Sequence, residues 1–415
     1  MGVAAARFGA STVGYLAKRP FLSDEKRSAA RHDLDRGNAA AIFKTLTKLR
    51  GTTLKVAQLL SLQTHLLPES YTAKFEESLH GIPPLNRALI RHQFIAELGA
   101  PPEKLFARFD SSAFAAASLG QVHRAVTRDG EDVAVKIQYP GVDKTIDTDI
   151  SLVRRVAARL PNPRLLQAHL NEIAERLREE VDYEREADSL VWFAERLSPT
   201  AYVTPTPVRT LTTRRILTMR FLAGPTLNDY LKTGPSPESR DRMAQKLWDL
   251  AMTQLYGLRR IQADSHPGNY LVAPDGRLGL LDFGCVKELA PAFADNHLAL
   301  LTAIRDNDRA AVAAHTDPLA VFGPDDDEAL RDRVRELVAV FADWFVKALA
   351  SERFDFSDAA FFEECGRLMA LYFGEIDLLR ASPNLVFIDR MLFGLTTLFH
   401  KMGARVTLTL PPSTG

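Results

Sequence analysis

Apolar residues recur along the chain at two spacings, and the switches between them divide it into helical and strand-forming stretches. Helical spacing fills residues 39–67, 69–79, 86–98, 142–160, 164–197 and 237–258, and most of the chain beyond Pro291. Short apolar runs typical of strands occupy residues 105–140 and 202–222. This order of a β-rich segment and a long helical remainder predicts an α+β fold.

Two Asp-Gly pairs inside the strand-forming stretches predict tight hairpins. Asp129-Gly130 separates a strand over 121–127 from the apolar run Val133–Lys136. Asp275-Gly276 separates residues 269–273 from residues 277–281. Glycine accepts the positive φ that a tight turn requires, so Asp-Gly between apolar runs is a strong hairpin signal.

Polar residues at the open end of the second hairpin match a metal-nucleotide site. Asp264-Ser-His-Pro-Gly-Asn269 precedes the hairpin, and Asp282-Phe-Gly284 follows it. Asn269 and Asp282 carry oxygen donors of the kind that Mg²⁺ prefers, and Asp264 stands where a phosphoryl acceptor would be oriented. Either motif alone is weak evidence, but both at this spacing, with a hairpin between them, are strong evidence.

Lys136 ends an apolar strand, so its ammonium needs a counter-charge if it is buried. The helical stretch 164–197 supplies the acids Glu180, Asp182 and Glu186. We expect Glu180 to be the partner, in a lysine–glutamate pair aimed at nucleotide phosphates. The alternative, a surface helix with solvated charges, holds for most acids of this stretch.

An alanine-rich loop (residues 114–121) stands where a kinase would have a glycine-rich loop. Each alanine Cβ restricts both positive φ and the close approach of backbone N–H groups to phosphate, so the loop should cradle nucleotide differently. Its sequence is equally compatible with a plain hairpin edge whose small residues serve packing. The predicted nucleotide-binding positions in the loop are Ala115, Ala116, Ala117, Ser118 and Gln121.

Taken together, these motifs resemble the UbiB/AarF family of atypical kinases, which is related to the mitochondrial coenzyme Q kinases. The matching elements are Ala115–His123, Lys136, Glu180–Asp182, Asp264–Asn269, Asp282–Gly284 and the Lys-x-Gly-Gln helix at Lys55–Gln58. The resemblance covers about residues 35 to 290. It implies a bilobal protein-kinase-like fold with a small β-rich N-lobe, a helical C-lobe and a family-specific N-terminal helical extension.

Two positions depart from the family pattern. Ala57 replaces the glycine of the Lys-x-Gly-Gln element; alanine is the better helix former, so the helix should survive. Arg220 stands in the hinge segment where an acidic residue is usual. Around it, Met219, Phe221 and Leu222 are the positions expected to contact the adenine.

The resemblance further implies that Lys55 and Gln58 lie over the active site and shield it from protein substrates. It implies ATP (or ADP) and Mg²⁺ as cofactors, Asp264 and Lys136 as catalytic residues, and a role in isoprenoid-quinone or other lipid metabolism. A small-molecule kinase of the aminoglycoside/choline phosphotransferase type is one alternative, although such kinases lack the Lys55–Gln58 helix and the Ala115–His123 segment. A nucleotide-binding pseudokinase scaffold is the other.

The predicted organisation has four parts: a flexible segment 1–35, the extension 36–104, the N-lobe 105–223 and the C-lobe 224–410. Within the last part, Asp325-Asp326-Asp327 invites a metal hypothesis. Acidic residues at the N-terminus of a helix beginning at Glu328 explain the triplet more simply.

Bulk properties narrow the partners. Lys and Arg together number 52, as do Asp and Glu, so no nucleic-acid footprint is expected. Two cysteines, Cys285 and Cys365, form no disulfide framework and suit a reducing cytoplasm. No stretch reaches the roughly 20 uninterrupted apolar residues of a bilayer span. The family resemblance implies a nucleotide and a lipid or quinone precursor as partners, with at most a peripheral membrane contact; the oligomeric state is not specified.

Overall fold

The computed structural model describes residues 85–117, 119–157, 171, 174–175, 177–262, 266–323, 326–374 and 382–412. These residues form two compact units, the first from 85–184 and Val208–Met219, the second from Arg185–Pro207 and 220–412. The predicted segment 1–35 and most of the extension 36–104, with Lys55 and Gln58, lie outside the described residues. Ser118 and Asp264 also lie outside them.

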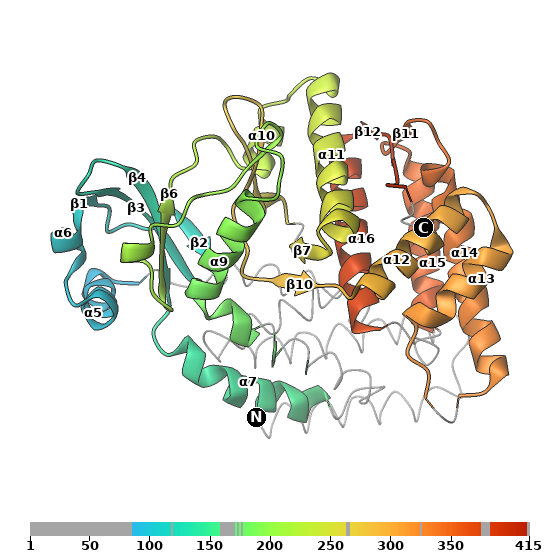
Figure 1. The fold of residues 1–415 in the computed structure, drawn as a ribbon, viewed down its shortest axis with the longest axis horizontal. Coiled ribbons are helices and arrows are strands. Elements are labelled where there is room, and N and C mark those ends of the chain that lie inside the picture. The colour runs from blue at the N-terminus through green and yellow to red at the C-terminus, as the bar shows by residue number, and fades with distance from the viewer. Residues whose placement is uncertain are drawn as a thin grey trace, which may run out of the picture. The chain divides into compact units, whose positions relative to one another are not determined.

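A five-stranded sheet forms the framework of the first unit (Figure 1). Its strand order is β1-β3-β4-β6, and β2 pairs with β3 beside this path. The elements are α5 (Arg87–Leu98), α6 (Pro102–Leu105), β1 (Phe106–Phe109), β2 (Ala115–Ala117), β3 (Gly120–Thr127), β4 (Asp132–Gln138), α7 (Val142–Ala157), the 3₁₀ turn Arg209–Leu211 and β6 (Ile216–Arg220).

The register of β3 against β4 divides the side chains between two faces. His123 pairs with Val135, and Val122 pairs with Lys136. Directly opposite residues share a face in an antiparallel pair, and successive residues alternate. Gln121, His123 and Val135 therefore lie on one face, and Val122 and Lys136 lie on the other.

The face that carries Val135 is packed against α5. Asn86 caps this helix by accepting the N–H of Leu89 at 2.9 Å, and Gly99 ends it in the left-handed conformation. The residues between this face and α5 are almost completely buried and form one hydrophobic core: Ile90, Phe94, Phe106, Ala125, Val133, Val135, Ile137 and Ile216. We call this face of the sheet the α5 face.

Both predicted hairpins are confirmed. Gly130 turns β3 into β4 with a φ of 84°, and Gly276 turns β8 (Tyr270–Val272) into β9 (Leu278–Leu280) with a φ of 83°. The prediction of one continuous helix over 164–197 was wrong. The helix ends at Glu180, and α9 (Tyr183–Ala194) begins after a turn, because the N–H of Tyr183 bonds the carbonyl of Arg214 at 3.0 Å.

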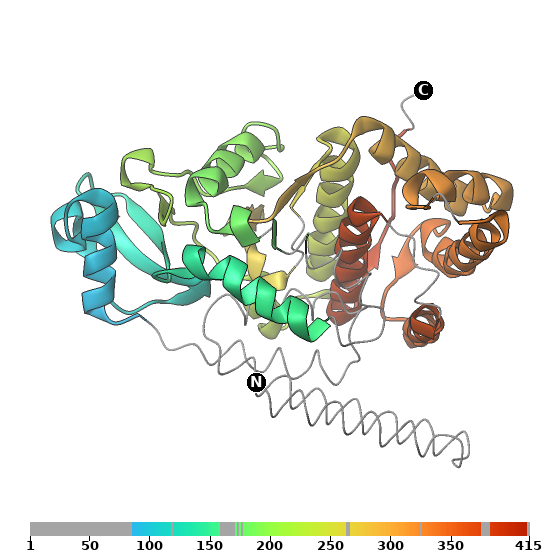
Figure 2. The same cartoon turned by 90° about the horizontal axis from the view of Figure 1, so that it is seen from below.

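The second unit is mainly helical. Its small sheets are β5-β9-β8, β10-β7 and β11-β12, and α11 and α16 lie side by side in both views (Figures 1 and 2). The remaining elements are β5 (Tyr202–Val203), α10 (Leu227–Lys232), α11 (Pro237–Met252), β7 (Arg260–Gln262), β10 (Val286–Glu288), α12 (Pro291–Arg305), α13 (Arg309–Thr316), α14 (Glu328–Leu349), β11 (Phe354–Asp355), α15 (Ala359–Gly374), α16 (Pro383–Met402) and β12 (Arg405–Val406). None of the described helices is both long and apolar enough to cross a bilayer.

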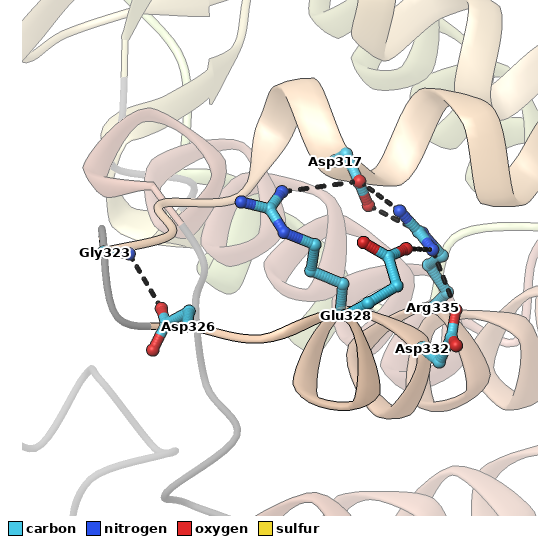
Figure 3. Close-up of polar contacts among 7 residues, drawn as sticks. Asp317, Gly323, Asp326, Glu328, Asp332 and Arg335 are labelled. Carbon is cyan, nitrogen blue, oxygen red and sulfur yellow. Dashed lines mark hydrogen bonds and ion pairs between the residues drawn. The ribbon is translucent and has the colours of Figure 1, made fainter.

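Two acids of the triplet are described by the structure: Asp327 caps α14, and Asp326 closes the loop that precedes it. Asp327 is the N-cap of α14 and accepts the N–H of Leu330 at 2.9 Å. Asp326 accepts the N–H of Gly323 at 2.7 Å (Figure 3). The helix-terminus interpretation is therefore confirmed for Asp327, whereas Asp326 holds the preceding loop.

The first turns of α14 also carry an ion-pair cluster. Arg335 Nε donates to Asp317 at 2.9 Å, and the same guanidinium bonds Glu328 and Asp332 (Figure 3). Arg335 holds the pKa of Asp317 below its ordinary value. Each acid thus faces a cation, so the cluster fastens the helix to the preceding turn.

Candidate active site

Lys136 lies in β4 of the first unit and is only 5% exposed. Its Nζ is 5.0 Å from the centroid of the Tyr183 ring, a distance at which an ammonium and an aromatic face attract each other. A lysine buried to this degree needs such compensation. The structure thus places the predicted lysine in an enclosed position beside the start of α9.

The corner that carries Glu180 is fastened to the Lys136 side of the sheet. Gln138 lies two residues after Lys136 on β4 and so shares its face. Its side-chain Nε2 donates to the carbonyl of Val181 at 3.0 Å. Glu180, the neighbour of Val181, is itself 9% exposed. Both members of the predicted lysine–glutamate pair are therefore buried in the same region of the first unit.

The alanine-rich loop forms a tight β2–β3 hairpin. Ala116 pairs with Gln121 and Ala117 with Gly120. Gly120 lies directly against the neighbouring strand, where a Cβ would overlap the carbonyl oxygen of Ile137. The single glycine of the loop is therefore required by packing at the turn end of the hairpin. Ala115 is exposed, as expected of a position open to a ligand.

The predicted hinge residues stand where the chain leaves the first unit. Met219 is the last residue assigned to that unit, and Arg220 the first of the second. Met219 is buried in β6, whereas Phe221 and Leu222 are half-buried residues of the segment that follows. Their role as adenine contacts stays a prediction.

In the second unit, the β8–β9 hairpin brings the two predicted metal ligands to neighbouring positions. Tyr270 pairs with Leu280, and the N–H of Leu281 donates to the carbonyl of Asn269 at 2.9 Å. Asp282 is the next residue, so its backbone lies one step from Asn269 across the ribbon. The hairpin therefore sets the spacing of the two ligands, as the sequence predicted.

The loop Asp282–Gly284, called the Asp282 loop, is stabilised by contacts of its own side chains. Asp282 Oδ1 accepts the N–H of Gly284 at 2.8 Å. Phe283 is buried, and its ring centroid lies 4.8 Å from that of Phe193 in α9. These contacts fix the backbone on which the Asp282 carboxylate stands.

Two glutamines that the sequence analysis did not single out complete this support. Gln262, at the end of β7, donates its Nε2 to the main-chain carbonyl of Asp282. Gln254 accepts the N–H of Gln262 at 2.7 Å from the π-helical turn Thr253–Gly257. Both side chains are almost fully buried. The position of Gln262, two residues before Asp264, was the one signal in the sequence.

The same π-helical turn is anchored to α12. Tyr256 and His297 are joined through the tyrosine hydroxyl and His297 Nδ1 at 2.8 Å. Complete burial lowers the pKa of His297 to about 4, so this imidazole is neutral at physiological pH. A π turn inside a helix is often found at functional sites, and here it carries Gln254 toward the Asp282 loop.

The donor set fits a magnesium ion that is shared with a nucleotide. Magnesium is usually held by one or two carboxylates together with substrate phosphates and waters, and an amide oxygen is an acceptable further ligand. Asp282 and Asn269 supply one of each. No group of three acidic, histidine or cysteine residues able to hold a metal occurs among the described residues.

Comparison with known proteins finds similarity to atypical kinases. Residues 78–316 match the family model of the ABC1 atypical kinase-like domain. The chain is 29% identical over 364 residues to the mitochondrial atypical kinase COQ8B of Danio rerio and 31% identical over 329 residues to that of Rattus norvegicus. These matches cover 86% and 78% of the chain, which spans 58% and 61% of the length of these relatives.

A solved structure shares the fold. The structure of Rv3197 from Mycobacterium tuberculosis, determined in complex with erythromycin, matches with a TM-score of 0.62 at 23% identity. The match covers 92% of this chain and 96% of that one. The expected α+β bilobal kinase-like fold is thereby confirmed.

Proposed function

Because the chain belongs to the ABC1 atypical kinase-like family, we propose that it binds Mg-ATP (or ADP) and transfers or hydrolyses the terminal phosphoryl group. The observation that carries this proposal is the β8–β9 register, which sets Asn269 one step from Asp282. An amide oxygen and a carboxylate at this spacing suit a cation that bridges phosphates.

The residues of the proposed site receive distinct roles. Lys136 would bind phosphate oxygens, and Glu180 would balance its charge, since an unpaired buried ammonium is costly. Asn269 and Asp282 would hold Mg²⁺, which when bound neutralises charge on the phosphates. Asp264 would orient the phosphoryl acceptor. Gln262 would keep the Asp282 backbone in place through its carbonyl.

For the acceptor, we propose a lipid or an isoprenoid-quinone precursor. Mitochondrial atypical kinases and the chloroplastic Activity of BC1 complex kinase 8 of Arabidopsis thaliana are among the relatives, the latter at 29% identity. The family match disfavours the aminoglycoside/choline phosphotransferase alternative. A pseudokinase scaffold is the remaining alternative, and turnover measurements separate it from an enzyme.

Replacing Lys136 by Met is expected to lower kcat/KM for Mg-ATP by about 100-fold, because a buried charge that contacts phosphate contributes roughly 3 kcal/mol. Phosphate release by the purified chain measures the effect. Lys144, exposed on α7, provides the control, and Lys144→Met should turn over ATP at the wild-type rate. Equal rates in wild type and Lys136→Met would refute the assignment of Lys136.

The same assay tests the acceptor class. Turnover should rise when vesicles made from a total lipid extract are added, and a soluble extract freed of lipid should not reproduce the rise. Stimulation by the soluble extract alone would instead indicate a metabolite kinase. No turnover under any condition, with nucleotide binding retained, would favour the scaffold.

A further inference from the structure

A chain of three side-chain hydrogen bonds crosses the α5 face of the first unit. The N–H of Leu85 donates to Gln121 Oε1 at 2.8 Å. Gln121 Nε2 lies 2.7 Å from His123 Nε2, and His123 Nδ1 lies 2.8 Å from the carbonyl of Asp110. The three bonds connect the entrance of α5, strand β3 and the end of β1.

The donors and acceptors of this chain are mutually consistent. Because Gln121 Oε1 accepts from a backbone N–H, the amide nitrogen of Gln121 must be the donor to His123. His123 Nε2 then accepts, and its Nδ1–H donates to Asp110, as in a neutral imidazole. Burial lowers the pKa of His123, which favours the same neutral form.

Both side chains are enclosed. Gln121 is 2% exposed and His123 is fully buried. The ring of Phe109 stacks on that of His123 with centroids 5.1 Å apart. Both functional atoms of the Gln121 amide are thus engaged within the protein, in a region where breaking a hydrogen bond leaves a desolvated polar group.

The strand register separates this network from Lys136. Gln121 and His123 point to the α5 face, whereas Lys136 pairs with Val122 on the opposite face. Gln121 also pairs with Ala116 across the β2–β3 hairpin. Its side chain is therefore directed away from the lysine, while its backbone forms part of the strand that pairs with the alanines of the loop.

We propose that Gln121 and His123 are positioning residues, which fix the β2–β3 hairpin from the α5 face. Gln121 thereby acts on nucleotide binding through the hairpin backbone and not by touching the nucleotide. The inference depends on the proposed function at one point, the binding of nucleotide by the hairpin. Gln121 was predicted from the sequence to contact the nucleotide directly; the inference gives it an indirect role instead.

Because the loop contains alanines where a kinase has glycines, fixing its hairpin favours nucleotide binding. Preorganising a loop lowers the entropic cost of binding, and alanine already removes much of the backbone freedom that glycine would keep. A hairpin that is already fixed from the α5 face loses little further conformational freedom when nucleotide binds. Loss of the network should therefore weaken binding even though no contact with ligand is removed.

A double-mutant cycle tests the proposal. Gln121→Met and His123→Leu each break the network with apolar side chains of similar size. Each is expected to weaken ADP and ATP binding by about tenfold in calorimetric titration, and the double variant by the same tenfold, because the two residues act as one unit. Val135→Ala, a buried change on the same face without a network bond, should bind within about twofold of wild type.

The outcomes separate the possibilities. If Gln121 contacted the nucleotide directly, His123→Leu would bind nucleotide with near wild-type affinity, and this result would overturn the proposal. An additive loss of about a hundredfold in the affinity of the double variant would overturn it as well. Amide hydrogen exchange provides an arm independent of nucleotide. Gln121→Met should accelerate exchange at Leu85 and in Ala115–Ala117, and unchanged protection there would also refute the proposal. If the wild-type chain binds no nucleotide but exchange is accelerated in Gln121→Met, the proposed function is refuted. The conclusion that the network fixes the hairpin would still hold.

Discussion

Asp282→Asn is expected to abolish the Mg²⁺-dependent part of the stabilisation that nucleotide gives the folded chain. A ligand at 100 times its Kd stabilises a protein by about 2.7 kcal/mol, which corresponds to a rise of roughly 3 °C in Tm for a chain of 415 residues. Asparagine retains the Oδ1 that accepts the Gly284 N–H at 2.8 Å. The loop should therefore survive while the charge that binds the cation is lost. Thermal melts with nucleotide, with and without Mg²⁺, measure the difference.

Asp275→Asn is the matched control. Asp275 lies at the turn of the same hairpin, is exposed, and bonds the backbone of Arg277 and not the Asp282 loop. The Mg²⁺-dependent shift should be intact in this variant. An undiminished shift in Asp282→Asn, or an equal loss in Asp275→Asn, would contradict the assignment of Asp282 as a metal ligand.

Gly120→Ala is expected to cause the largest loss of stability among single substitutions in the alanine-rich loop. The added Cβ would overlap the carbonyl oxygen of Ile137. That oxygen belongs to the backbone of β4, which cannot swing aside as a flexible side chain can. We expect a loss of about 3 kcal/mol or more, seen as a fall of at least roughly 3–4 °C in Tm for a chain of 415 residues.

Gly366→Ala provides the opposite expectation for the same chemical change. Gly366 is exposed in α15, and nothing lies within 4 Å of the position of an added Cβ. Alanine favours a helix over glycine by about 1 kcal/mol, so this variant should be at least as stable as wild type. Urea denaturation of both variants measures the contrast. Comparable stability of Gly120→Ala and wild type would show that the turn end of the hairpin is not packed against β4 as described.

Much of the framework was predictable because it depends on local rules. Asp129-Gly130 and Asp275-Gly276 fixed two hairpins, since a turn with positive φ leaves few residue choices. The second hairpin in turn fixed the spacing of Asn269 and Asp282. The family and its bilobal fold followed from the motifs around these hairpins, above all Asp264–Asn269 and Asp282–Gly284.

The missed features are long-range. The break before Tyr183 depends on a bond to the Arg214 carbonyl, a contact that hydrophobic periodicity does not encode. The support of Asp282 by Gln262 and Gln254 requires knowing which buried amides meet in space.

The role of Gln121 illustrates the same limit at a predicted site residue. Its position in the alanine-rich loop suggested a ligand contact, but its face of the sheet was decided by the register against β4. A shift of one residue would have reversed the assignment, because side chains alternate along a strand. Position in the sequence therefore placed Gln121 in the loop but left the direction of its side chain open.

The most direct test of the central claim is electron paramagnetic resonance of Mn²⁺, substituted for Mg²⁺ and titrated into the chain with a non-hydrolysable ATP analogue. One Mn²⁺ should be immobilised per chain in a nucleotide-dependent manner. Asn269→Ala and Asp282→Asn should each abolish this binding, and Asp275→Asn should preserve it. Wild-type Mn²⁺ binding in both of the first two variants would contradict the claim that these residues hold the metal of a nucleotide site.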